Sequence, residues 1–349
     1  MSPTFIRPPA LKPGDTVAAL SLSSGFVTEV IHRYEAGRRQ ARSELGWNVV
    51  PAPNALRGEE YLYRNPAARA DDLHWALENP EVRGLLSVIG GDDSVRLLPH
   101  LRLDIIRAHP KVFLGFSDST VTLLHFLRAG VMAFHGPSLL TDLAEHGGMH
   151  PFAARGIRWA TMQAAPFRLE PAPEWTEQHV EWLDPALQET PRSFHPSSGW
   201  EWLQGEAAAE GHLMGGCIEV LDMLNGTPGW PEARLWQGAI LCLETSEDVP
   251  PPAQVGYWLR NFAAQGILER AAGLVIARPR GYTPEMVEEL YRWVMRVLWE
   301  AGREQMPLLG GVDFGHTSPQ LTLPLGARAR LDPVSGVFEV LEGGVEEQG

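Results

Sequence analysis

The segment from Lys111 to Thr120 places a hydroxyl side chain, Ser117, between an apolar strand pattern and the expected start of a helix. A serine at such a bend projects beyond the end of a sheet, beside backbone N–H groups that no helical hydrogen bond uses. Enzymes that transfer acyl groups place a serine nucleophile in this position. The run Gly-Phe-Ser-Asp-Ser differs from the G-x-S-x-G elbow, so a second interpretation stays open, in which Ser117 or Asp118 caps the following helix.

Two later strand patterns end in groups that could serve Ser117. Glu244 directly follows the apolar run Leu241–Leu243, where a carboxylate needs a partner. His316 lies between Gly315 and Thr317 after the last apolar strand, which makes it a better candidate base than the other histidines. Glu247 and Asp248 are expected to form a solvated acidic turn. The sequence thus predicts a serine, a glutamate and a histidine at the tips of separate strands.

Gly90 and Gly91 end another predicted strand. Glycines at such a position let backbone N–H groups approach a ligand closely, and ligands of open α/β sheets bind beyond the carboxyl ends of the strands. We therefore expect the N–H groups of Gly91 and Asp118 to form an oxyanion hole.

Three residues are candidates for substrate binding: Asp92, Trp200 and Arg278. Trp200 could stack on a planar base, line a peptide groove, or simply cover the seam between two domains. Arg278, like Arg280, follows a predicted strand and is placed either to receive a substrate carboxylate or to lie in solvent.

The elements that must position these groups follow from hydrophobic periodicity. Residues 15–150 alternate apolar runs with helical patterns, which indicates β-α-β units and a mainly parallel sheet. The fold class is therefore α/β, with an N-terminal domain over 1–162, a proline-rich connector or substrate loop over 163–205, and a C-terminal α/β domain over 206–349. The strands expected in the N-terminal domain are 16–22, 47–51, 84–89, 112–116 and 131–137, and its helices are 29–45, 66–78 and 119–128. In the C-terminal domain we expect strands at 238–243, 273–277 and 307–312, helices at 252–265 and 284–301, and short β segments over 320–341.

Composition narrows the class of protein. The chain has 349 residues and a formal net charge of −14, which disfavours nucleic acid or an anionic membrane as partner. We expect no secretory signal, because the N-terminus lacks an apolar run, and no membrane span, because no apolar stretch is long enough. Cys217 and Cys242 lie in apolar runs without metal-ligand spacing, so we expect a cytoplasmic protein. A serine mechanism of the kind considered above needs no metal and no other cofactor.

The ordered set of motifs resembles the LD-carboxypeptidases (serine peptidase family S66), which include the microcin C immunity proteins. The resemblance covers nearly the whole chain, and Leu-Glu-Thr-Ser-Glu is more similar to the microcin-immunity branch. One departure is Gly215-Gly-Cys-Ile, where the family often has Gly-Gly-Asn-Leu. The matching segments are Leu11–Thr16, Val88–Gly91, Ser94–Leu98, His109–Thr120, His135–Pro137, Gly215–Ile218, Leu243–Glu247 and Gly315–His316.

The resemblance implies a Rossmann-like N-terminal domain carrying the nucleophile Ser117 and a smaller C-terminal α/β domain carrying Glu244 and His316. It also implies Gly91 and Asp118 as oxyanion donors, a homodimer, and a metal-independent serine carboxypeptidase or amidase. The substrate would be the L,D-bond of a muropeptide or the amide of an aminoacyl-nucleotide toxin. We expect activity to fall on the acid side with a midpoint in the ordinary range of histidine. The alternative is a two-lobed small-molecule binding protein without catalysis.

Overall fold

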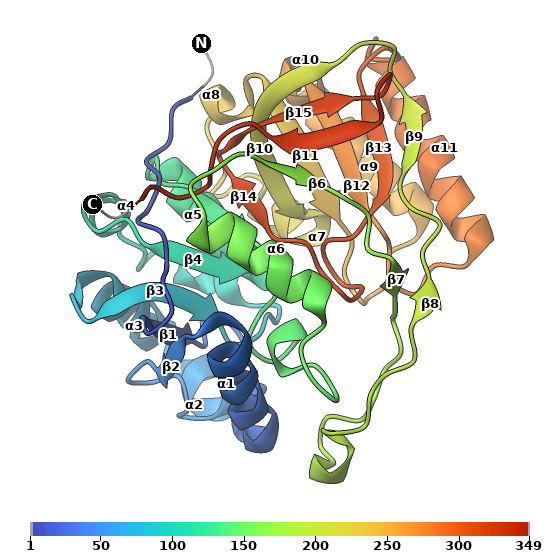
Figure 1. Ribbon diagram of the computed structural model, residues 1–349. Coiled ribbons are helices and arrows are strands. Elements are labelled where there is room, and N and C mark those ends of the chain that lie inside the picture. Colours follow the sequence, from blue (N-terminus) through green and yellow to red (C-terminus); the bar gives the residue numbers. More distant parts are fainter. Residues whose placement is uncertain (1–2, 348–349) are drawn as a thin grey trace.

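The computed structural model describes residues 3–347, and within them most strands belong to two sheets that lie side by side (Figure 1). The first sheet has the order β14–β5–β4–β3–β1–β2. Its neighbouring strands are parallel except for β14, which runs antiparallel to β5. The bounds are β1 Thr16–Leu20, β2 Asn48–Pro51, β3 Val82–Ser87, β4 Val112–Gly115, β5 Ala133–His135 and β14 Leu323–Leu325.

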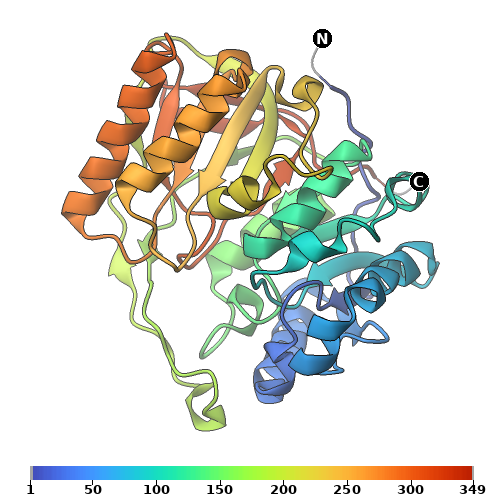
Figure 2. The ribbon, with the colours of Figure 1, turned by 180° about the vertical axis from the view of Figure 1, so that it is seen from behind.

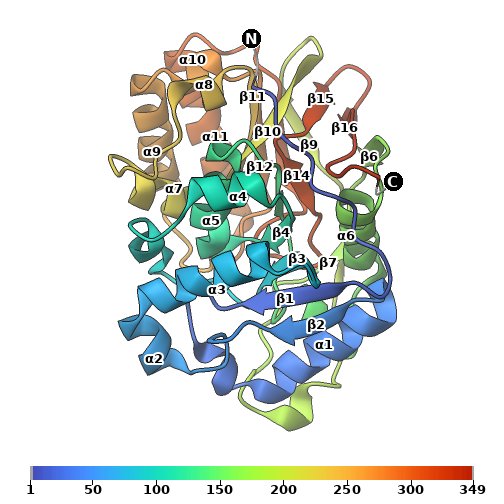
Figure 3. The same cartoon turned by 90° about the vertical axis from the view of Figure 1, so that its left-hand side faces the viewer.

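Helices cover both faces of the first sheet because its buried strands carry apolar residues on both sides. In β1, Val17 and Ala19 pack in one buried cluster with residues of α1 (Ile31–Leu45) and α6 (Pro151–Met162). Ala18 and Leu20 pack in another with residues of α3 (Pro66–Glu78) and α5 (Thr120–Arg128). Figure 3 shows α1 and α3 beside β1 and β2. Two shorter helices complete this part, α2 (Glu59–Arg64) and α4 (Leu103–Ala108).

The second sheet has the order β6–β16–β15–β10–β11–β12–β13–β9. Its central strands β10 to β13 are parallel, and the outer strands run antiparallel to their neighbours. Helices α9 (Pro252–Ala264) and α11 (Pro284–Glu300) lie together over one face (Figure 2). The strand bounds are β6 Phe167–Leu169, β9 Glu201–Gln204, β10 Ala209–Cys217, β11 Ala239–Glu244, β12 Gly273–Ala277, β13 Leu308–Val312, β15 Arg328–Asp332 and β16 Val337–Val340. The remaining helices are α7 Ile218–Leu224, α8 Ala233–Trp236 and α10 Ile267–Arg270.

The proline-rich segment 163–205, expected as a connector or substrate loop, contains short strands. It supplies β6 and β9 at opposite edges of the second sheet, and β7 (Glu174–Trp175) pairs with β8 (His195–Pro196). The loop between β7 and β8 extends away from both sheets (Figure 1). Prolines remove backbone donors, so short edge strands are the sheet positions that such a sequence can occupy.

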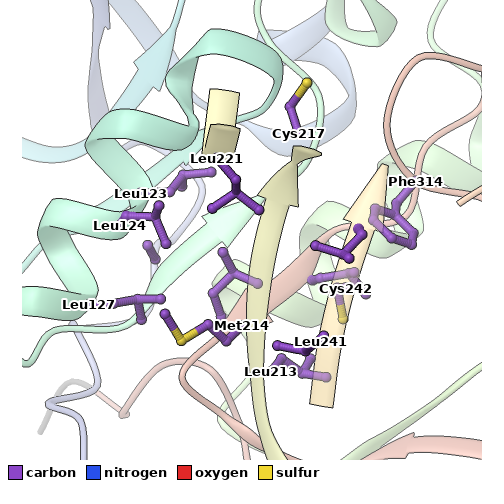
Figure 4. Packing of buried hydrophobic residues seen from close by; sticks show 14 of the residues in the cluster. Leu123, Leu124, Leu127, Leu213, Met214, Cys217, Leu221, Leu241, Cys242 and Phe314 are labelled. Carbon is purple, nitrogen blue, oxygen red and sulfur yellow. The ribbon is translucent and has the colours of Figure 1, made fainter. Parts of the chain in front are cut away.

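The two sheets share a core where α5 meets α7 and β10. Leu123 and Leu127 of α5, Met214 of β10 and Leu221 of α7 are all fully buried in one cluster (Figure 4). At the same boundary the hydroxyl of Thr120 accepts a 3.1 Å hydrogen bond from the backbone N–H of Cys217. Within residues 3–347, no helix combines the length and apolar character that crossing a bilayer requires.

Candidate active site

Ser117 stands at a sharp bend after β4. Its φ of 58° lies in the left-handed region, which non-glycine residues rarely adopt, and it begins a short 3-10 helix (Ser117–Ser119) that leads into α5. Neither the 3-10 helix nor α5 has a side-chain hydrogen bond that caps its start. The interpretation of Ser117 or Asp118 as a helix cap is therefore not supported by a hydrogen bond. Backbone strain of this kind concentrates at functional sites.

His316 joins the two other predicted residues. Its Nε2 lies 3.1 Å from the Ser117 hydroxyl oxygen, and its Nδ1 lies 2.6 Å from Oε2 of Glu244. Ser117 comes from the end of a strand in the first sheet, whereas Glu244 ends β11 and His316 follows β13 in the second sheet. A hydroxyl, an imidazole and a carboxylate linked in this order are the arrangement that activates a serine for attack.

Gly315 leaves the space that this contact needs. Its φ is +87°, and a Cβ there would come within 2.8 Å of both Cβ and Oε2 of Glu244. A side chain at residue 315 would push the carboxylate away from His316. The glycine that flanks the histidine in the sequence therefore has a packing role beside Glu244.

A second histidine lies on the other side of Glu244. His135, at the end of β5, places Nε2 3.7 Å from Glu244 Oε1, and both side chains are fully buried. Burial by itself raises the pKa of Glu244, but His316 and His135 lower it more, so the net shift is downward and the carboxylate stays charged. Sequence reasoning did not single out His135 as functional, although a polar residue at the end of an apolar strand was the available signal.

Glu247, expected in a solvated acidic turn, also contacts the catalytic candidate His316. Its Oε2 lies 2.9 Å from His316 Nε2, the same nitrogen that faces Ser117. The hydrogen bond from His316 lowers the pKa of Glu247 to about 2. Because 57% of the side-chain surface is exposed, water screens this contact more strongly than the buried contact with Glu244. The side chain is solvated, as expected, but the sequence did not indicate its contact with His316.

The two carboxylates change the proton affinity of His316. Burial lowers its pKa, but Glu244 and Glu247 raise it more, and the result is a pKa of about 10. This shift lies above the ordinary histidine range expected from the sequence and favours a ring with protons on both nitrogens, with Nδ1 donating to Glu244.

The predicted oxyanion donors lie beside Ser117. A Cβ on Gly90 would come 2.9 Å from the Ser117 hydroxyl oxygen, so the loop after β3 passes close to the nucleophile. No hydrogen bond from the backbone N–H of Gly91 or Asp118 is found within residues 3–347. Their role as oxyanion donors stays a prediction, and these unused N–H groups are compatible with it.

The Asp118 side chain stabilises the backbone around Ser117 through hydrogen bonds. Its buried carboxyl accepts hydrogen bonds from the Ser23 hydroxyl at 2.5 Å and from the Ser94 backbone N–H at 2.8 Å. The Ser94 hydroxyl in turn donates to the Asp118 carbonyl at 2.7 Å. These bonds tie the segments that follow β1, β3 and β4, so the backbone around Ser117 is held from three sides.

A cavity of about 270 Å³ opens in front of Ser117 and His316. Its walls include Ser24 and Gly91, which follow β1 and β3, where the strand order of the first sheet reverses. Ligands of open α/β sheets bind at this kind of reversal. The aromatic residues on the walls are Phe26, Phe116 and Trp182, and the charged ones are Arg33, Glu177, Arg192, Glu247 and Arg280.

The three predicted substrate residues do not line this cavity. Trp200 donates its indole N–H to Asp313 at 2.7 Å, and Arg278 contacts the other oxygen of Asp313 at 2.8 Å. Asp313 thus anchors part of the connector, and Arg280 lies on the cavity wall instead of Arg278. Asp92 is exposed, so substrate binding by these three residues stays a prediction without a contact to the cavity.

Comparison with known proteins shows which family this chain resembles. The model of the LD-carboxypeptidase N-terminal domain matches residues 17–136, and that of the LD-carboxypeptidase C-terminal domain matches residues 210–331. The murein tetrapeptide carboxypeptidase of Pseudomonas aeruginosa is 35% identical over 322 residues, covering 90% of this chain and 92% of the relative. The microcin C7 self-immunity protein MccF of Escherichia coli is 26% identical over 325 residues, covering 91% of each chain.

A solved structure shares both the fold and part of the sequence. The MccF-like protein from Streptococcus pneumoniae, crystallised in complex with AMP, superposes with a TM-score of 0.83 at 30% identity, covering 94% of this chain and 98% of that one. Family models and relatives agree across both sheets. The chain therefore belongs to the LD-carboxypeptidase family of peptidases, family S66.

Proposed function

We propose that this protein is a metal-independent serine carboxypeptidase or amidase that uses Ser117, His316 and Glu244. The observation that supports it best is the His316 ring, which contacts the Ser117 hydroxyl with one nitrogen and the Glu244 carboxylate with the other. In the unprotonated state, Nε2 of His316 takes the proton from Ser117 as its oxygen attacks an amide carbonyl. Glu244 holds the ring orientation and stabilises the imidazolium that forms.

The oxyanion is stabilised by the N–H groups of Gly91 and Asp118, and losing one such donor typically costs about 100- to 1,000-fold in turnover. His316 then returns its proton to the leaving amine, and water hydrolyses the acyl-enzyme by the same steps. Because the serine is activated by a base, we expect full activity in the presence of a metal chelator.

Two substrate classes are candidates, and each has its own support. The L,D-bond of a muropeptide is favoured by the 35% identity to a murein tetrapeptide carboxypeptidase. The amide of an aminoacyl-nucleotide is favoured by the relative crystallised with AMP and by Trp182, whose flat ring lines the cavity. The Arg33 guanidinium lies over that ring, 4.2 Å from its centroid, and a flat ring on the cavity wall is a surface on which a planar base can stack.

Product analysis by mass spectrometry tests the function. The protein is incubated with a muropeptide tetrapeptide and with an acidic amino acid joined by an amide to a nucleotide analogue. We expect release of the terminal residue or of the nucleotide amine by the wild type and none by Ser117→Ala. A serine-directed fluorophosphonate should label the wild type at residue 117. Unchanged hydrolysis by Ser117→Ala would contradict the mechanism, and ligand binding without labelling or turnover would favour the non-catalytic binding protein.

A further inference from the structure

Two side chains of opposite charge lie on the cavity wall next to the catalytic residues. Glu247 is in the loop after β11, and Arg280 is in the loop after β12, the neighbouring strand of the second sheet. The positive charge of Arg280 contributes to the low pKa of Glu247. The pair therefore presents an anion and a cation to whatever enters in front of Ser117.

Most of the other charges on this wall are already engaged by the protein. Arg33 donates to the Leu140 carbonyl at 2.7 Å, and Arg192 is paired with the buried Glu145. Glu177 accepts the backbone N–H of Gly281 at 2.7 Å. In the part of the chain that the structure describes, no hydrogen bond or ion pair joins the Arg280 side chain to a neighbour. Arg280 is thus the arginine on this wall whose donors are free for a ligand.

The position of Glu247 conflicts with the catalytic state of His316. A carboxylate can accept a hydrogen bond from Nε2 only while that nitrogen carries a proton. To act as a base, Nε2 must offer its lone pair to the Ser117 hydroxyl instead, and a carboxylate 2.9 Å away would then face that lone pair without a proton between them. Glu247 therefore has to leave Nε2 before Ser117 can be activated, and its exposed side chain is free to move.

We propose that Glu247 and Arg280 select substrates whose acyl part carries both an ammonium group and a carboxylate. The carboxylate pairs with Arg280, and the ammonium draws Glu247 away from His316. The proton on Nε2 then passes to solvent, which leaves the neutral ring able to accept the Ser117 proton. This inference rests on the proposed function and names the chemistry that its acyl site recognises.

Both candidate substrate classes can supply this chemistry. An acidic amino acid with a free α-amino group has the two charges in an aminoacyl-nucleotide. A diamino dicarboxylic acid has them in the side chain of a muropeptide. His316 contacts Glu247 directly and the charge of Arg280 acts on it; the titratable residues Glu177 and His179, from the loop between β7 and β8, line the same cavity. Their charges are the same for all the substrates compared below.

The experiment measures kcat/KM for each amide in three forms: unmodified, with the ammonium acetylated, and with the carboxylate amidated. We expect the kcat/KM of the wild type to fall about tenfold or more with either modification. A tenfold change is the size of effect that a difference of one pKa unit represents. For Glu247→Gln, the kcat/KM values of the unmodified and acetylated forms should agree within about twofold. Because this variant lacks one carboxylate beside His316, the acid limb of its pH profile should lie at lower pH than in the wild type. Arg280→Gln should become indifferent to the carboxylate while it keeps its preference for the ammonium. Glu269→Gln, which removes the same charge from the exposed surface of α10, is the matched control and should behave like the wild type.

Equal rates on unmodified and acetylated amides with the wild type would overturn this inference but leave the proposed function standing. Retention of the ammonium preference by Glu247→Gln would overturn it as well. If the wild type hydrolyses none of the amides, the proposed function fails instead. The inference is then decided by NMR titration of His316 with the same unmodified and acetylated compounds: only the unmodified compound should lower its pKa, and equal pKa values with both would overturn the inference.

Discussion

The two halves of the active site are stabilised by different interactions. Around Ser117, the first sheet holds the backbone with hydroxyl and N–H hydrogen bonds to Asp118 and with close glycine packing. Around His316, the second sheet places the charged groups Glu244 and Glu247 on opposite ring nitrogens. We therefore expect the first half to determine where the nucleophile lies and the second half to determine when it can lose its proton. Substitutions that change shape should therefore affect the half around Ser117, and substitutions that change charge should affect the half around His316.

The largest expected effect within this comparison comes from Glu244→Gln. The amide has nearly the same shape but no charge, so it neither stabilises the imidazolium nor enforces the tautomer with a proton on Nδ1. By analogy with the aspartate of other triads, kcat should fall roughly 10,000-fold. Steady-state kinetics with unchanged circular dichroism would check this, and a loss below tenfold would show that charge is not what the second half supplies.

Gly90→Ala tests the first half by shape alone. The added methyl group would lie 2.9 Å from the Ser117 hydroxyl oxygen and 3.0 Å from its Cβ, so the nucleophile must shift. A misplacement of about 1 Å can cost roughly 100-fold in rate, and we expect a loss of kcat of this order. The pH profile should keep its midpoint, because no charge changes. A displaced midpoint of the pH profile with little loss of kcat would contradict the distinction between the two halves.

The pH dependence of the wild type examines the second half directly. His316 must be unprotonated to act as the base, and its pKa in the free protein is raised to about 10. Since kcat/KM reports the free enzyme, it should increase with pH through the range above 7, by up to about tenfold per unit. Measurement with a substrate that has no ammonium group gives the clearest test. A flat profile between pH 8 and 10 would contradict the assigned charge state.

Thr120→Val should have the smallest effect, at the boundary between the halves. It removes the acceptor of the 3.1 Å hydrogen bond from the Cys217 N–H while keeping a similar volume. Leaving a buried donor without this partner should lower the free energy of unfolding by about 1–2 kcal/mol. Urea denaturation measures the change, with Thr283→Val in an exposed helix cap as a comparison. An unchanged unfolding midpoint for Thr120→Val would show that the boundary does not depend on this bond.

Periodicity predicted several elements closely, including the strand ends next to Ser117 and Glu244. The helix expected over 66–78 and the strand expected over 273–277 have those bounds in the structure, and the strand ends before Ser117 and around Glu244 lie within a residue of the expected positions. The long central strand β10 was not predicted. Its sequence contains three glycines within Ala209–Cys217, and glycines in a strand resemble loop signals because they add no side chain to the alternating pattern.

The charge relations inside the site could not be predicted in the same way. Glu247 was assigned to solvent because its neighbours are polar, and nothing in the linear sequence reports that the loop after β13 brings His316 to it. Arg278 and Arg280 are two residues apart after the same strand, yet Arg278 contacts Asp313 together with Ser197 and Trp175 of the connector, whereas Arg280 lies on the cavity wall. Such contacts depend on loop conformation between distant segments, which local patterns do not encode.

The pairing of β14 with β5 limits how this polypeptide can be divided. After passing His316, the chain returns to the first sheet at Leu323–Leu325 and covers the edge of β5. A fragment ending near residue 162 would leave that strand edge bare, and bare edges invite aggregation. The two segments matched by separate family models therefore cannot be exchanged independently of each other. A chimaera of two relatives would need β14 from the same parent as the N-terminal segment.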